Sequence, residues 1–176
     1  MSEHASDLIA KANHSRRERR LDDAFREYRQ AADVSSTPGS ERWLINALTG
    51  LGQISRDRKQ LDSALLYCAQ ALALCRQHSS PSDIAHTARH LGDLYRESGM
   101  LSQAEPLLIE AISIYRHGAA VEPLELANAI RPLALLKTTL GDAAAARPLW
   151  QEALELYTSA NVSAGIDECS ARLGNV

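Results

Sequence analysis

Apolar residues recur along this 176-residue chain at the three- and four-residue spacing typical of amphipathic α-helices. Leu101, Ala104 and Leu108 form one such stripe. No segment follows the alternating pattern of a half-buried strand, and segments rich in Ser, Gly and Pro interrupt the stripes at 35–40, 78–83 and 117–123. The pattern predicts an all-α chain with helices over 5–17, 21–34, 40–57, 61–78, 82–98, 102–117, 123–139, 142–159 and 162–173.

Two alanines seven residues apart recur through the chain. The first alanine of each pair stands at positions separated by 40, 40 and 42 residues: Ala24, Ala64, Ala104 and Ala146. Small residues such as Gly52 and Gly92 recur on the helix before each pair, where they would let two helices cross closely. A larger side chain there would overpack the crossing at a cost of about 1–3 kcal/mol. The chain is therefore expected to be a stack of helix pairs.

The repeat also predicts where the domain and its units begin and end. We expect a single domain over 1–176, with repeats at approximately 5–39, 40–81, 82–122 and 123–160 and a capping helix at 162–173. Side-chain oxygens near the start of the second helices should cap free backbone N–H groups. The residues expected to do this are Asp22, Asp62, Ser102 and Asp142.

The third unit carries Leu91, Gly92, Tyr95 and Gly99, followed by Ala104 and a second alanine seven residues later. This arrangement resembles the tetratricopeptide repeat (TPR). The period of 40–42 residues exceeds the usual repeat of about 34 and is similar to the longer repeats of kinesin light chains. The resemblance implies an all-α fold, a right-handed α-α superhelix (solenoid) of four TPR-like helix pairs plus a C-terminal capping helix. It also implies that proteins or peptides bind in the concave groove lined by the first helix of each pair.

The residues expected to line this groove are the first-helix positions that remain once the core positions are assigned. They are Asn13, Arg16, Arg17, Asn46, Thr49, Gln53, Arg56, His86, Arg89, His90, Asp93, Arg96, Asn128, Arg131 and Leu135. Arginine and amide side chains offer forked donors that suit carboxylates and peptide backbone. We therefore expect a non-catalytic protein–protein interaction scaffold that binds an extended, acidic or C-terminal-carboxylate peptide. The alternative is an ordinary solvated face.

Charge and hydropathy narrow the classes of partner. The net charge of −3 and the pI of about 6.1 predict no general attraction to nucleic acid or to anionic membrane. The basic run Arg16–Arg20 contains Glu18 and lacks an aromatic platform, so we interpret it as a solvated helix end and expect no nucleic acid partner. No apolar run reaches the length of a membrane span or a signal peptide, and we expect a cytoplasmic protein with no membrane partner.

Catalytic and metal chemistry have weaker support in the sequence. The chain contains no GxSxG motif and no phosphate-binding Gly-rich loop, so we expect neither enzymatic activity nor a cofactor. His86 and His90 lie four residues apart with Asp93 one turn further, a spacing that can hold a divalent metal, but we treat this as a weak candidate and expect no metal. Three cysteines without CxxC spacing are interpreted as buried free thiols.

Self-association is the main alternative function. The first and last units of a repeat stack are expected to leave apolar stripes, and stacking these ends is a simple route to a homodimer. In that case the chain would be a structural or assembly module whose repeat surfaces contact a second copy.

Overall fold

The computed structural model describes residues 2–118 and 122–174. Within these ranges the chain forms nine α-helices and no strand, which confirms the expected all-α class. The helices belong to two compact units, Met1–Thr87 and Ala88–Val176, and the boundary falls inside α5 (Pro81–Glu97). The expected single domain remains a prediction. No helix in the described part of the chain is long and apolar enough to cross a membrane.

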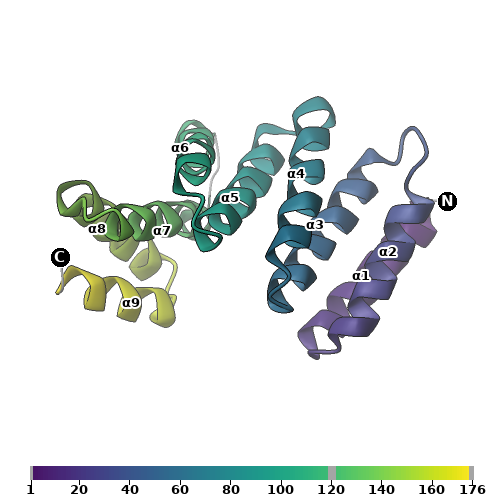
Figure 1. Ribbon diagram of the computed structural model, residues 1–176, viewed down its shortest axis with the longest axis horizontal. Coiled ribbons are helices and arrows are strands. Elements are labelled where there is room, and N and C mark those ends of the chain that lie inside the picture. The colour runs from purple at the N-terminus through teal and green to yellow at the C-terminus, as the bar shows by residue number, and fades with distance from the viewer. Residues whose placement is uncertain (1, 119–121, 175–176) are drawn as a thin grey trace. The chain divides into compact units, whose positions relative to one another are not determined.

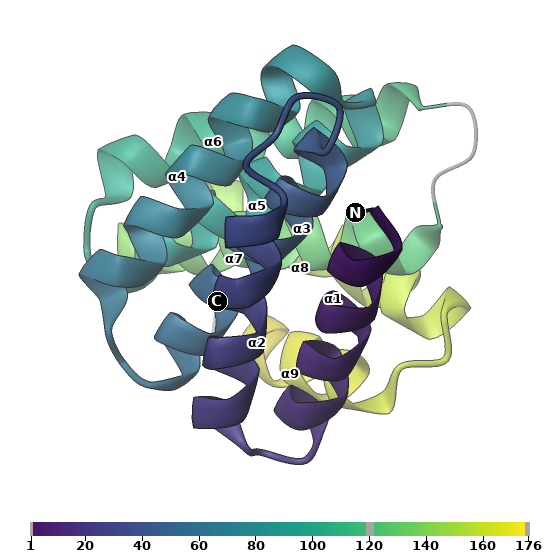
Figure 2. The same ribbon diagram turned by 90° about the vertical axis from the view of Figure 1, so that its right-hand side faces the viewer.

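The first unit is built from two antiparallel helix pairs and the beginning of α5 (Figures 1 and 2). The pairs pack internally, and both α1 and α2 also pack against α3. The helices are α1 (Ser2–Arg17), α2 (Leu21–Val34), α3 (Glu41–Asp57) and α4 (Leu61–His78).

The second unit contains the rest of α5 and four further helices. In this unit α7 packs against α6 and α8, and α9 packs on α8. The helices are α6 (Leu101–His117), α7 (Pro123–Thr139), α8 (Ala143–Ser159) and α9 (Ser163–Leu173). The sequence-based bounds agree to within one residue, except that α1 begins three residues earlier than expected.

Close helix crossings explain the recurring glycines. A Cβ atom built on Gly52 would lie 2.4 Å from Cys68 Sγ, and one built on Gly92 would lie 2.9 Å from two side-chain carbons of Leu108. Both distances are shorter than an ordinary carbon contact of about 3.5 Å. The sequence-based prediction that larger residues would overpack these crossings is confirmed. The three cysteines are free and buried, also as expected.

Three of the four expected helix caps are wrong. A capping residue directly precedes its helix, but α2, α4 and α6 begin two residues earlier than caps at these positions would require. The residues therefore lie inside the helices: Asp22, Asp62 and Ser102. The residues that precede these helices are Arg20, Gln60 and Met100, and none makes a side-chain cap hydrogen bond. Asp142 does cap α8, because its carboxylate accepts a hydrogen bond of 3.0 Å from the Ala145 N–H.

The short turn inside each repeat contains one residue in the left-handed backbone region. These residues are Arg19 (φ 62°), Lys59 (φ 63°), Gly99 (φ 75°) and Gly141 (φ 74°). Glycine adopts this conformation without penalty, whereas a residue with a Cβ atom loses about 1–2 kcal/mol. The third and fourth repeats therefore have the relaxed residue, and the first two repeats have a strained cation.

Candidate functional site

Groove residues of the first unit surround a cavity of about 310 Å³ between α1, α3 and the start of α5. Ile9, Ile45 and Tyr28 contribute apolar surface to it. Its polar lining includes five of the residues expected from the sequence: Asn13, Asn46, Thr49, Gln53 and His86. We call this space the amide cavity. The structure thus brings together the first-unit part of the predicted groove.

Two neighbouring side chains fix the orientation of the amides in this cavity. The Tyr28 hydroxyl donates a hydrogen bond of 2.6 Å to Asn13 Oδ1, and the Arg16 guanidinium donates one of 2.6 Å to Gln53 Oε1. A guanidinium can only donate, so the carbonyl oxygen of Gln53 must face it. Burial raises the pKa of Tyr28, although Arg16 and Arg17 oppose this effect, and the phenol is a donor at neutral pH. Both amides therefore keep their NH₂ groups for another acceptor.

A second cavity, of about 410 Å³, adjoins the first at Asn13. Its other lining residues come from the ends of α1 and α3 and from the turn after α1: Arg16, Arg17, Arg19 and Asp57. Arg16 pairs with Asp57 at 3.2 Å in addition to binding Gln53. We call this space the arginine cavity.

The groove arginines of the second unit are paired with carboxylates of the same chain. Arg131 donates two hydrogen bonds to Glu168, of 2.6 and 3.0 Å, and these bonds raise the pKa of Arg131. Arg89 lies 3.6 Å from Glu125. Arg96 donates two hydrogen bonds of 2.9 and 2.7 Å to its near neighbour, the predicted groove residue Asp93. The forked donors expected to receive a ligand carboxylate are thus occupied from within.

The remaining predicted groove residues are Asn128 and Leu135 on α7 and Arg56 on α3. Asn128 Oδ1 accepts a hydrogen bond of 3.0 Å from the Tyr157 hydroxyl, the same arrangement that holds Asn13 in the first unit. Leu135 is half-buried on α7. In the first unit, Arg56 on α3 is close enough to Cys68 to oppose the effect of burial, which raises the pKa of that thiol to about 12.

The weak metal hypothesis has no geometric support. Among the residues that the structure describes, no three His, Cys, Asp or Glu side chains are placed to hold one ion. Asp93 is bound by Arg96, and His90 Nε2 lies 3.3 Å from the Arg89 guanidinium. A cation at His90 would therefore lie beside a positive charge.

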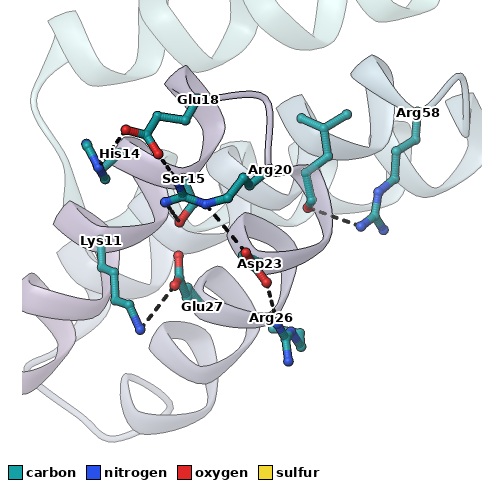
Figure 3. Close-up of polar contacts among 10 residues, drawn as sticks. Lys11, His14, Ser15, Glu18, Arg20, Asp23, Arg26, Glu27 and Arg58 are labelled. Atoms are coloured by element: carbon teal, nitrogen blue, oxygen red, sulfur yellow. Dashed lines mark hydrogen bonds and ion pairs between the residues drawn. The ribbon is translucent and has the colours of Figure 1, made fainter.

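The self-association hypothesis stays a prediction, but the outer face of the first repeat contains a polar site. There, a cavity of about 160 Å³ is lined only by polar residues: Lys11, Asp23, Arg26, Glu27 and Gln30. Lys11 Nζ lies 3.2 Å from the buried Glu27 carboxylate, which bridges α1 and α2 (Figure 3). The equivalent residues of the fourth repeat are Leu133 and Leu149, which line an apolar cavity with residues of α6. An ion pair therefore replaces the apolar contact at this face.

Sequence reasoning missed two residues that matter for the site. It interpreted Arg19 as part of a solvated helix end, although its position in the repeat is the one occupied by Gly99 and Gly141. The alignment of Arg19 with these two glycines could have predicted its left-handed backbone from the sequence. The second missed residue is Tyr28, whose hydroxyl orients Asn13.

Antiparallel helix pairs that repeat every 40–42 residues, cross at small residues and expose polar first-helix faces define a TPR-class helical repeat protein. The sequence profile of the MalT-like TPR region matches residues 4–173, and the chain belongs to this family. The resemblance inferred from the sequence is confirmed. No curated protein matches the sequence.

Solved structures with this fold come from several proteins. BtubC (BKLC) from P. vanneervenii has 20% identity and a TM-score of 0.79 over 90% of this chain and 65% of its own. Aspartyl phosphate phosphatase F from Bacillus subtilis has 15% identity and a TM-score of 0.85 over 96% of this chain and 44% of its own. Kinesin light chain TPR-like repeats from Podosopora anserina have 13% identity and a TM-score of 0.76 over 90% and 77%. The chain thus spans less than two thirds of the first two proteins, and these similarities concern the fold.

Proposed function

We propose that this chain is a non-catalytic protein-interaction module that binds an extended peptide in the amide cavity of the first unit. The observation that carries the proposal is the orientation of two amides. The carbonyl oxygens of Asn13 and Gln53 accept hydrogen bonds from Tyr28 and Arg16, so their NH₂ groups point away from these partners and can donate to a ligand. An extended peptide presents backbone carbonyl oxygens that are matched acceptors for such donors.

The remaining walls of the amide cavity suit the same ligand. Asn46 is exposed, and its side chain has no hydrogen-bond partner within the described residues, so it can both donate to and accept from a peptide backbone. Ile9 and Ile45 offer apolar surface for one ligand side chain. Because Tyr28 and Arg16 already hold two amides in place, binding would order few additional side chains, which lowers its entropic cost.

The charge of the ligand can be narrowed by the same geometry. A ligand carboxylate in the second unit would have to displace Asp93 from Arg96 or Glu168 from Arg131. The first unit has arginines with fewer internal carboxylates, around the arginine cavity. We therefore propose that an acidic side chain or C-terminal carboxylate of the peptide binds in the first unit.

The pKa values of the buried thiols and phenols favour a non-catalytic role. Burial raises the pKa of Cys68 and of Tyr115 to about 12, and it also raises the pKa of Cys169. A raised pKa keeps these groups protonated at neutral pH, so they are poor nucleophiles and bases.

The proposal is tested with a displayed library of random peptides selected on the full chain. Enriched peptides are synthesised with a fluorophore, and their affinity is measured by anisotropy for the wild type and for Asn46→Ala and Gln53→Ala. Each substitution removes about one hydrogen bond to the peptide, so we expect affinity to fall about three- to ten-fold.

Gln70→Ala is the matched control, because Gln70 is an exposed amide on α4 outside the amide cavity. It should leave the affinity unchanged. The proposal fails if no peptide is enriched, or if the enriched peptides bind Asn46→Ala, Gln53→Ala and Gln70→Ala equally well.

A further inference from the structure

The basic run at the end of α1 divides into paired and unpaired charges. Glu18 contacts His14 at 3.1 Å and also pairs with Arg20 (Figure 3). Arg20 further contacts Ser15 Oγ at 3.4 Å and Asp23 at 3.5 Å. These contacts neutralise Glu18 and Arg20 within the first helix pair.

Arg17 and Arg19 remain after this pairing. Both are exposed, and neither forms an ion pair or hydrogen bond with a side chain in the described part of the molecule. Both line the arginine cavity, whose one carboxylate, Asp57, is bound by Arg16. Two exposed arginines therefore line a space of about 410 Å³ with no carboxylate left to balance their charge.

The backbone at Arg19 lies in the left-handed region, with φ of 62°, where the third and fourth repeats have glycine. Lys59 occupies the same position in the second repeat with φ of 63°, so the strain alone assigns no role to either side chain. Arg19 differs from Lys59 because it lines the arginine cavity. One role is to complement the partial negative charge at the C-terminal end of α1. That role alone would not require a cavity bordered by a second unpaired arginine.

We propose that the arginine cavity binds a carboxylate of the peptide held in the amide cavity, with Arg17 and Arg19 as its donors. This inference rests on the proposed function and adds the position of an anionic group to it. Asn13 borders both cavities, so the carboxylate lies directly beside the ligand residue that contacts Ile9 and Tyr28. Arginine suits this task because its planar fork can donate two parallel hydrogen bonds to one carboxylate.

A matched pair of glycine substitutions separates this role from a structural one. Arg19→Gly removes a cation from the arginine cavity, and Lys59→Gly removes a cation from the equivalent turn of the second repeat, outside that cavity. Both substitutions relax a left-handed residue, so both should raise the unfolding midpoint by about 1–4 °C. Only Arg19→Gly should weaken binding of the enriched peptides, by about two- to five-fold at low salt. Arg17→Gln should weaken binding by a similar factor.

The source of the carboxylate is distinguished with the same enriched peptides. Each is synthesised with a free C-terminus, with an amidated C-terminus, and with its Asp and Glu residues replaced by Asn and Gln. Loss of affinity on amidation assigns the α-carboxylate, and loss on side-chain replacement assigns an acidic residue. In either case the loss should be smaller in Arg19→Gly, where Arg17 is the remaining donor.

The result that overturns the inference is equal affinity for charged and neutral peptides, or unchanged affinity in Arg19→Gly and Arg17→Gln. If Asn46→Ala still weakens binding in that case, the proposed function stands without an anion subsite. If Asn46→Ala also has no effect, the proposed function itself is wrong.

Discussion

Gly50 on α3 leaves room for the ring of Tyr28, which belongs to both the core and the candidate site. A Cβ atom built there would lie 2.3 Å from Tyr28 Cε1, 2.4 Å from Cζ and 2.6 Å from Cδ1. An ordinary carbon contact is about 3.5–4.0 Å, so Gly50→Ala would force the ring to move by more than about 1 Å. Tyr28 is only 2% exposed and packs in a cluster with Ile9 and Ile54, which leaves little room.

The expected loss of stability follows from three effects. Overpacking in a core costs about 1–3 kcal/mol. Displacing the ring also weakens the hydrogen bond from its hydroxyl to Asn13, which contributes about 1 kcal/mol. Alanine gains about 1 kcal/mol of helix propensity over glycine. We therefore expect Gly50→Ala to lower the free energy of unfolding by about 1–3 kcal/mol, measured by urea denaturation with far-UV circular dichroism.

The same substitution in a variant that lacks the Tyr28 ring tests whether the ring causes the loss of stability. Tyr28→Val removes all three of the ring atoms that a Cβ at Gly50 would meet. In that background Gly50→Ala should become stabilising by up to about 1 kcal/mol, because only the helix propensity remains. The reasoning is refuted if Gly50→Ala is neutral in the wild type, or equally destabilising in both backgrounds.

Three further predictions concern a turn, a phenol and an end face. Gly99→Ala should lower the free energy of unfolding by about 1 kcal/mol, because φ is 75° there; no atom lies within 4 Å of the added methyl group, so a loss much above 2 kcal/mol would point to another cause. Burial raises the pKa of Tyr115 from 10.0 to about 12, so the stability that this shift contributes is complete below pH 10 and is lost as pH rises through 12. In urea denaturation at alkaline pH, Tyr115→Phe should therefore lose less stability than the wild type over this range, and an unchanged pH dependence would contradict the raised pKa. Lys11→Leu combined with Glu27→Leu replaces the ion pair of the first repeat with the leucines found at the equivalent positions of the fourth repeat. Light scattering at increasing protein concentration should detect association of this variant, and scattering equal to that of the wild type would show that the ion pair does not prevent stacking.

Much of the fold could be predicted from the sequence because the same contacts recur in each repeat. Leu91, Gly92 and Ala104 specify a crossing between two helices, and their spacing gave helix bounds within one residue for eight of the nine described helices. The caps were harder to predict. The turn contains a left-handed residue followed by one more residue before the helix, so Asp62 lies inside α4 although its side chain is of a capping type.

The candidate site was only partly predictable for a related reason. The polar face of a first helix follows from the helical period, and Asn13, Asn46 and Gln53 were found in this way. Pairing between repeats does not follow from it. The partner of Arg131 is Glu168, 37 residues away on α9, and this pairing depends on the reach of two long side chains from different helices.

The most direct test of the account is the side-chain amide NMR spectrum of the chain labelled with ¹⁵N at Asn and Gln, recorded while an enriched peptide is added. The NH₂ groups of Asn13 and Gln53 are directed toward the proposed peptide by Tyr28 and Arg16, and Asn46 borders the same cavity. We predict that the resonances of these three amides shift together with increasing peptide, while those of Gln30 and Gln70 remain in place. Binding of the peptide with no shift of Asn13, Asn46 and Gln53 would contradict the central claim that the amide cavity of the first unit holds the ligand.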